Sequence, residues 1–209
     1  MHIESSRKKI SLFPTILYQF KINEYLIDEL KEIILNEYKQ WGNSNYISVS
    51  SDNQYKREDS CIKEISEILD NEILAILENM KVMRVSHYIS GMWHNVSKEP
   101  YQHQQHTHPN SFLSGIIYIN CPDGCGETIF TDPVSERKVF LPDLFDMNQE
   151  NSRAFSIKPE KGLVTIFPSW LNHQVNNGTM KSTDLRISTA FNYNLHGNAS
   201  QLNTARLEY

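Results

Sequence analysis

The chain is poor in the residues that mark disulfide-rich, metal-knuckle and disordered proteins. Its 209 residues include only 3 cysteines, 8 glycines and 8 prolines. Three is an odd number, and Cys121 and Cys125 form no Cys-x-x-Cys array, so we interpret them and Cys61 as reduced thiols. The low glycine and proline counts argue against long disordered regions.

Long apolar runs and basic stripes are also missing. No apolar stretch reaches the roughly 20 residues that a membrane-spanning helix needs. The start, Met1-His2-Ile3-Glu4, does not resemble a signal peptide, so we expect a cytoplasmic protein with no membrane contact. The net charge of −5, with no basic stripe, makes nucleic acid a poor candidate partner.

The apolar content that is present suffices for one full core. With 39% hydrophobic residues in 209, the composition predicts a single domain over residues 1–209. Its first part, 1–81, holds an extended segment at 10–22 and two helices with an apolar stripe. We expect the first helix at 24–40, with Asn23 as its N-cap, and the second from Asp59 or Ser60. The polar stretch 42–58 between them is typical of a loop.

From about Val82 the apolar pattern changes to period two, which is typical of strands. Turn residues such as Pro122-Asp123-Gly124 separate the expected strands. The strands are predicted at 85–96, 112–120, 127–131, 137–141, 154–157, 162–167, 173–176 and 185–195. The chain is therefore expected to be mainly β, with an α-helical N-terminal part. Its core, 82–196, would be a double-stranded β-helix (jelly-roll) with the helices packed on one sheet, followed by a tail at 197–209.

Alternation in the last expected strand separates an apolar face from a polar one. Ile187, Phe191 and Tyr193 share the face that can pack beneath the helices, and Arg186 and Ser188 share the other. A buried arginine needs an anionic partner, and its planar fork matches a carboxylate. A protein carboxylate, or a place at the surface, would serve Arg186 equally well.

Other strand positions could line the same space between the sheets. Tyr118, on the strand 112–120, could offer its hydroxyl there, or it could be an ordinary core tyrosine. Trp93 and Asn95, on the strand 85–96, are candidates for the cavity wall, with plain strand packing as the alternative. The loop 132–152 is long and partly apolar, so we expect a lid or a substrate-facing loop.

Three histidines are spaced so that they could hold one metal ion. His106 and His108 lie two apart on an extended segment, so their side chains point to the same side. His173 follows an apolar strand and a turn at Pro168, which can direct it back into the barrel. His103 fits the same face less well. The remaining histidines have no partner at ligand spacing: His2, His87, His94 and His196.

These segments resemble the iron(II)- and 2-oxoglutarate-dependent oxygenase superfamily. The chain is similar to the branch that holds prolyl hydroxylases and the 2OG-Fe(II) oxygenase group of bacteria and phages. The resemblance is carried by HTHPNSFLSGIIYIN, GETIFTDP, GLVTIFPSWLNHQV and LRISTAFN, and the start SLFPT extends it over most of the chain. The family pattern is a His-x-Asp/Glu pair, a YLN-like strand, a distal histidine and then an arginine or lysine. Here these positions hold His106 with His108, Tyr118, His173 and Arg186.

One position departs from the family. The usual ligand set is two histidines and one carboxylate, whereas His108 stands where the carboxylate belongs. Either the site has three histidine ligands, His106, His108 and His173, or another group such as Glu127 or Asp132 completes it. We prefer three histidines.

The resemblance implies an enzyme that needs Fe(II), 2-oxoglutarate and O2. 2-Oxoglutarate would chelate the metal and place its far carboxylate on Arg186, helped by Tyr118 and Ser188. Its decarboxylation to succinate would be coupled to hydroxylation of a small-molecule or peptidyl substrate, such as a prolyl or other amino-acid side chain. The resemblance leaves open a homodimer.

Two other readings remain open at this point. Cupin metalloproteins also combine a double-sheet barrel with His-x-His, but the glutamate expected soon after that pair is absent, since Phe112 and Leu113 occupy those positions. A non-catalytic jelly-roll binding protein would carry the histidines incidentally.

Overall fold

The computed structural model describes residues 8–41, 46–49, 53–82, 86–98, 102–134 and 143–196. The helical elements are α1 (Glu24–Trp41), the 3-10 turn η1 (Gln54–Lys56) and α2 (Ser60–Asn79). The strands are β1 (Tyr18–Lys21), β2 (Tyr46–Val49), β3 (Ser86–Ser97), β4 (His103–His106), β5 (Leu113–Asn120), β6 (Thr128–Thr131), β7 (Ala154–Ile157), β8 (Leu163–Pro168), β9 (His173–Val175) and β10 (Arg186–His196). The strand expected at 137–141, the tail 197–209 and part of the loop 132–152 lie outside the described residues.

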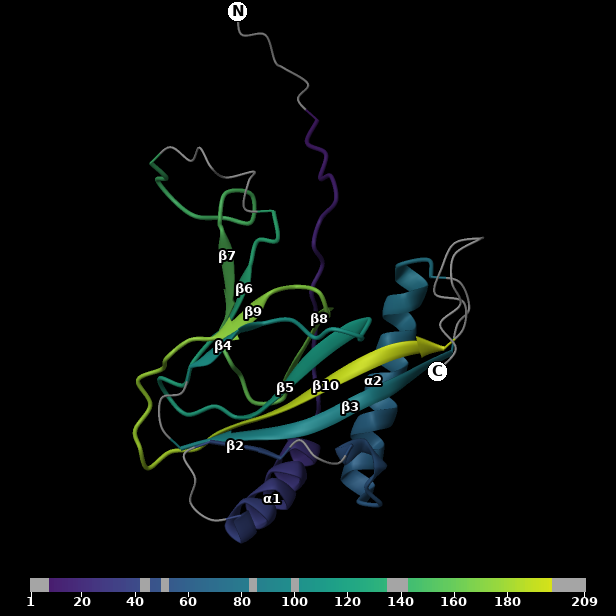
Figure 1. Cartoon of the computed structure of the whole chain (residues 1–209), viewed down its shortest axis with the longest axis vertical. Helices are drawn as coiled ribbons and strands as arrows, with labels where there is room; N and C mark the ends of the chain where they lie inside the picture. Colours follow the sequence, from purple (N-terminus) through teal and green to yellow (C-terminus); the bar gives the residue numbers. More distant parts are fainter. Residues whose placement is uncertain are drawn as a thin grey trace, which may run out of the picture.

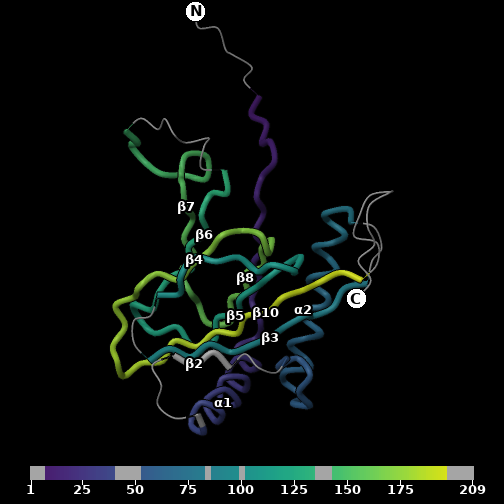
Figure 2. The backbone as a smooth tube through the Cα atoms, viewed as in Figure 1, coloured from purple at the N-terminus to yellow at the C-terminus, as the bar shows by residue number. Residues whose placement is uncertain are grey.

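Two antiparallel sheets build the β part (Figure 1). The larger has the order β1-β8-β5-β10-β3-β2, and the smaller has the order β4-β9-β6-β7. Figure 2 shows β10 running beside β3, although the two strands are far apart in the sequence. This is the jelly-roll that the alternation and the family resemblance predicted, and the prediction of the fold class is confirmed. Among the described helices, none is long and apolar enough to cross a membrane.

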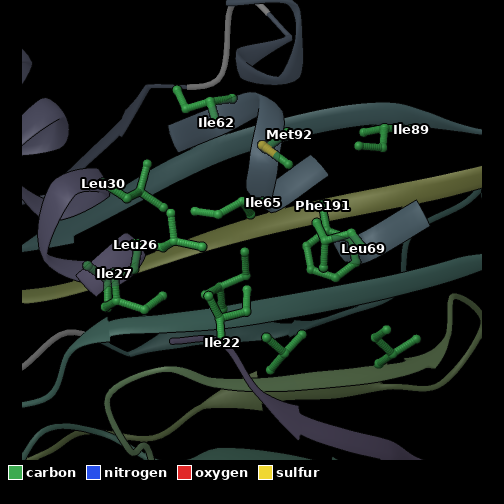
Figure 3. Packing of buried hydrophobic residues seen from close by; sticks show 14 of the residues in the cluster. Ile22, Leu26, Ile27, Leu30, Ile62, Ile65, Leu69, Ile89, Met92 and Phe191 are labelled. Carbon is green, nitrogen blue, oxygen red and sulfur yellow. The ribbon is translucent and has the colours of Figure 1, made fainter. Parts of the chain in front are cut away.

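Both helices cover one face of the larger sheet, as predicted. Figure 3 shows Leu26 and Leu30 of α1, and Ile65 and Leu69 of α2, in one buried cluster with Phe191 of β10. Ile187 and Tyr193 belong to the same buried cluster, so the apolar face of the last strand packs beneath the helices. The opposite face of the larger sheet, which carries Arg186 and Ser188, lines the candidate site described below.

Both helices begin where the sequence predicted, and α1 begins at a side-chain cap. The side-chain oxygen Oδ1 of Asn23 accepts a hydrogen bond of 3.0 Å from the backbone N–H of Tyr25, which confirms Asn23 as the N-cap of α1. α2 begins at Ser60 after Asp59, within the expected range. The Tyr193 hydroxyl donates a 2.6 Å hydrogen bond to Asp70, which ties β10 to α2.

Three expectations at the level of elements need correction. The stretch 42–58 is not simply a loop, because Tyr46–Val49 forms the edge strand β2 on β3 and Gln54–Lys56 forms η1. The segment 10–22 is a strand only over Tyr18–Lys21, where β8 offers a partner, and Pro14 before it lacks a backbone donor. β4 was not predicted, because His-Gln-Gln-His has no apolar alternation.

Candidate metal centre

Three imidazoles converge at one end of the smaller sheet. His106 ends β4 and is paired with His173, the first residue of β9. His108 lies just beyond β4, where its backbone N–H donates a 2.9 Å hydrogen bond to Ser169. One ring nitrogen from each histidine lies within 4.8 Å of the others, close enough to hold one metal ion. The sequence prediction named these three residues, and the structure brings them together.

The hydrogen bonds of the rings leave nitrogens available to a cation. Nδ1 of His106 lies 2.8 Å from the carbonyl oxygen of Gln104, and Nδ1 of His173 lies 3.0 Å from that of Leu171. In a neutral ring Nδ1–H then donates and Nε2 keeps its lone pair. The Nε2 atoms of His108 and His173 are 3.2 Å apart. Nitrogens this close, with lone pairs facing inward, fit the donor set of a divalent transition metal.

Burial keeps two of these rings neutral. It lowers the pKa of His173 to about 3. The hydrogen bond that His173 donates to the Leu171 carbonyl oxygen opposes this, whereas the neighbouring histidines His106, His108 and His103 lower the pKa further. Burial likewise lowers the pKa of His108 to about 4, with His106 and His103 adding to the effect. Both rings are therefore uncharged at neutral pH, which is the form that ligates metals.

No carboxylate takes part in this cluster within the described part of the chain. Glu127 turns its side chain to the Ser156 hydroxyl on the neighbouring strand, and neither it nor Asp132 is in the group of close donors. Of the two ligand sets left open by the sequence, the geometry favours the three-histidine one.

A cavity of about 50 Å³, partly open to solvent, extends from the histidines across the larger sheet. Arg186 and Ser188 of β10 line it, and so do Trp93 and Asn95 of β3. The prediction that Trp93 and Asn95 form part of the wall is confirmed. The cavity therefore joins the histidine cluster to the polar face of the last strand.

Arg186 is buried in this cavity without a carboxylate beside it. Its side chain is 8% exposed, and Nε donates to the carbonyl oxygen of Gly126 at 3.4 Å while Nη1 donates to Ser188 Oγ at 3.3 Å. No ion pair joins it to an acidic residue within the described ranges. Within the described residues Arg186 thus has neither a carboxylate partner nor a surface position, the two alternatives that the sequence left open. Its guanidinium can therefore accept an anionic ligand.

Tyr118 is buried next to Arg186 and is not among the residues that line the cavity. The guanidinium carbon is 6.0 Å from the centre of the Tyr118 ring. The hydroxyl donates a 2.7 Å hydrogen bond to Thr128 Oγ1. Burial raises the pKa of Tyr118 to about 12, so the hydroxyl stays protonated and can act as a donor.

His103 was set aside in the sequence and proves to line the cavity. Its ring stacks on that of His106, with the ring centres 4.3 Å apart. His103 is not among the close metal donors, as expected, but a register shift between His103 and His106 breaks the alternation and turns its ring toward the cavity. Three histidines within six residues, His103, His106 and His108, were the available signal.

Comparison with known proteins agrees with this geometry. Residues 91–192 match the family model described as "Putative 2OG-Fe(II) oxygenase". The match to the 2OG-Fe(II) oxygenase family thus covers 102 of the 209 residues, including the three histidines and Arg186. This confirms that it is a 2-oxoglutarate-dependent oxygenase, whose cofactors are Fe(II) and 2-oxoglutarate. The match supports neither the cupin nor the non-catalytic alternative.

Solved structures of such oxygenases share the fold. A prolyl-4-hydroxylase from Pseudomonas putida aligns with a TM-score of 0.58 and 12% identity, covering 88% of this chain and 89% of that one. A prolyl hydroxylase from Trichoplax adhaerens gives 0.62 and 13%, covering 85% and 82%. A viral collagen prolyl hydroxylase from Paramecium Bursaria Chlorella virus-1 gives 0.56 and 13%, covering 85% and 94%. No curated protein matches the chain.

Proposed function

We propose that His106, His108 and His173 hold the Fe(II) of this oxygenase, and that Arg186 binds the far carboxylate of 2-oxoglutarate with Ser188 and Tyr118. The observation that carries the proposal is the cavity that contains both the three close imidazoles and a buried arginine with no described carboxylate partner. Imidazole nitrogen is a suitable donor for Fe(II). When bound, iron and 2-oxoglutarate supply the activation of O2 that couples decarboxylation to substrate oxidation.

The residues around this cavity position the cosubstrate and keep it dry. The planar fork of Arg186 can take a carboxylate through two N–H groups, and Ser188 Oγ, 3.3 Å from Nη1, fixes the side-chain rotamer. The protonated Tyr118 hydroxyl can add a hydrogen bond if it leaves Thr128. Ile116, Val175 and Ala190 form an apolar lining that limits water near the reacting end.

The primary substrate is proposed to be a peptidyl side chain or a small molecule. Both kinds are found among proteins of this fold. The Trichoplax prolyl hydroxylase is described in complex with a peptide fragment of hypoxia inducible factor, and another neighbour is described as the nogalamycin epimerase SnoN. In this chain Trp93 and Asn95 offer an aromatic surface and an amide at the cavity wall, where such a substrate would contact the protein.

Anaerobic titration separates the metal ligands from the cosubstrate contact. Wild type should bind one Fe(II), whereas His106→Ala and His173→Ala should each weaken binding by about a hundredfold or more. His196→Ala, which changes an exposed histidine at the end of β10, is the control. Unchanged Fe(II) affinity in both site variants would overturn the assigned ligands.

The same protein then tests Arg186. Fe(II)-loaded wild type should bind 2-oxoglutarate and, with O2, convert it to succinate. Arg186→Gln should raise the Kd for 2-oxoglutarate by about a hundredfold, since one charge-assisted carboxylate pair contributes roughly 2–3 kcal/mol, and leave Fe(II) affinity unchanged. Arg186→Lys should fall between the two. Equal Kd values in wild type and Arg186→Gln would contradict this role.

A further inference from the structure

Two cysteines lie in the turn beside the proposed cosubstrate site. Cys121 follows the end of β5, and the backbone N–H of Cys125 donates a 3.0 Å hydrogen bond to Pro122 that closes the turn. The turn is held from outside, because the Gly124 carbonyl accepts N–H groups from Thr179 at 2.6 Å and Met180 at 3.1 Å. Both cysteines are free and half-buried, and they flank the closed turn closely enough for each thiol to shift the pKa of the other.

The same turn contacts Arg186. Gly126, the residue after Cys125, gives its carbonyl oxygen to Arg186 Nε at 3.4 Å. Cys125 is thus directly followed by the residue whose carbonyl oxygen holds the guanidinium, so a shift at Cys125 reaches Arg186 through one residue of backbone. Conversely, the positive charge of Arg186 acts on both sulfur atoms.

The surroundings make the two thiols unequal. The Cys121 thiol, and then the charge of Arg186, lower the pKa of Cys125, against the opposing effects of burial and Glu127. The Cys125 thiol and burial raise the pKa of Cys121, with Glu160 adding to them and Arg186 opposing. Cys125 therefore loses its proton more readily and is the better nucleophile, and Cys121 is its protonated neighbour.

We propose that Cys121 and Cys125 form an oxidation site, at which a small-molecule disulfide converts the two thiols into an intramolecular disulfide, and that 2-oxoglutarate on Arg186 slows this conversion. First, the Cys125 thiolate attacks one sulfur of the small disulfide, giving a mixed disulfide and releasing a thiolate. Cys121 then loses its proton and attacks the Cys125 sulfur, which releases the second small thiol. Two protein thiols are oxidised, and one disulfide is reduced to two thiols.

The effect of 2-oxoglutarate follows from charge and rests on the proposed function for the place of its carboxylate. A carboxylate on Arg186 neutralises the charge that favours the Cys125 thiolate. The thiolate fraction at pH 7 then falls, and exchange becomes slower. The disulfide would thus form faster in protein molecules that have no 2-oxoglutarate bound.

The first arm of the test asks whether the disulfide forms. Anaerobic Fe(II)-loaded protein is mixed with oxidised glutathione at pH 7, and the product is read by intact mass and peptide mapping. Wild type should lose two hydrogens, with Cys121 joined to Cys125. Cys121→Ser should stop at a glutathione adduct on Cys125, and Cys125→Ser should react far more slowly. Cys61→Ser should behave as wild type, because Cys61 is 1% exposed.

The second arm adds saturating 2-oxoglutarate, whose binding is measured separately on the same sample. The exchange rate should fall about threefold, because a higher thiol pKa reduces the thiolate fraction more than it raises nucleophilicity. Arg186→Gln should react slowly with or without 2-oxoglutarate. Failure of wild type to form the Cys121–Cys125 disulfide overturns the oxidation site. Equal rates while 2-oxoglutarate is bound overturn the coupling, whereas absence of 2-oxoglutarate binding overturns the proposed function and leaves the first arm valid.

Discussion

At the scale of single residues, the proposed metal site has an imidazole, that of His108, where the usual ligand set has a carboxylate. His108 contributes a neutral donor, so a bound Fe(II) would keep one more positive charge than in a set with an aspartate. The extra charge favours the two carboxylates of 2-oxoglutarate. An aspartate in its place would restore the usual set, although its side chain is shorter than that of histidine.

We therefore predict opposite outcomes for two substitutions at His108. His108→Ala should remove one of three donors and weaken Fe(II) binding by about tenfold to a hundredfold. His108→Asp should bind Fe(II) within about tenfold of wild type, because carboxylate oxygen is also a good donor. Anaerobic Fe(II) titration measures both. If His108→Ala binds iron as tightly as wild type, His108 is not a ligand.

A second histidine, outside the site, should make stability depend on pH. His94 is fully buried beneath the helices, and its Nδ1 lies 2.7 Å from Thr189 Oγ1. Burial, and then the charge of Arg57, lower the pKa of His94 to about 3. Below about pH 6.5, His94 therefore binds a proton in the unfolded chain but not in the folded chain. The free energy of unfolding falls as the pH drops from about 6.5 toward 3.

The expected slope for His94 is about 1.4 kcal/mol per pH unit in this window. Urea unfolding of metal-free protein at pH 7, 5.5 and 4.5 measures it. His108 and His173 also have lowered pKa values, so wild type should show a steeper total slope. His94→Gln should reduce the slope by one proton, and His196→Gln should not. An unchanged slope in His94→Gln would contradict the prediction.

The sequence was sufficient to name the side chains that the structure brings together in the proposed site, but not their neighbours. The spacing of the three histidines and the need of a buried arginine for an anionic partner made four residues identifiable: His106, His108, His173 and Arg186. Thr128, the partner of the Tyr118 hydroxyl, could not, because one hydroxyl on a short strand has no distinguishing pattern. Contacts that depend on three-dimensional register stay invisible until the strands are paired.

At the scale of elements, α2 depends on one apolar face. Leu69 is fully buried, whereas Leu74 on the same helix is 46% exposed. Truncating a buried leucine removes its transfer free energy and leaves a cavity, which together cost about 2–5 kcal/mol. We predict that Leu69→Ala lowers the free energy of unfolding by about 3 kcal/mol. Leu74→Ala should change it by less than about 0.5 kcal/mol.

Urea unfolding of metal-free protein compares the two variants under the same conditions. An equal loss in both would mean that α2 does not pack on the larger sheet as described.

The same contrast explains which elements could be predicted. The long, periodic helices were located within a residue or two at their starts, whereas β2 and β4 are four residues long and mostly identified by their partners β3 and β9.

At the scale of the whole molecule, one sheet serves both the core and the site. The helix-facing side of β10 carries Ile187 and Phe191, and its other side carries Arg186 and Ser188. The alternation of that strand predicted both layers. The order of strands within the sheets could not be derived from alternation, since it depends on pairings such as β10 with β3 across a long stretch of chain.

This shared sheet predicts that helices and site unfold together, as expected for one domain over residues 1–209. Far-UV circular dichroism follows α1 and α2. Fluorescence of Trp41→Phe/Trp170→Phe protein follows Trp93, whose ring centre lies 5.8 Å from that of His108. The two melting curves should coincide, because separating the helices from β10 exposes the core that supports Arg186.

Fe(II) with 2-oxoglutarate, added anaerobically, should raise both midpoints equally. A ligand at a hundred times its Kd adds about 2.7 kcal/mol to the folded state as a whole. Arg186→Gln should lose the part of the shift that 2-oxoglutarate contributes and keep the part due to Fe(II). Two separated transitions, with only the fluorescence midpoint raised by ligands, would instead mean that residues 1–81 fold as a unit independent of the site.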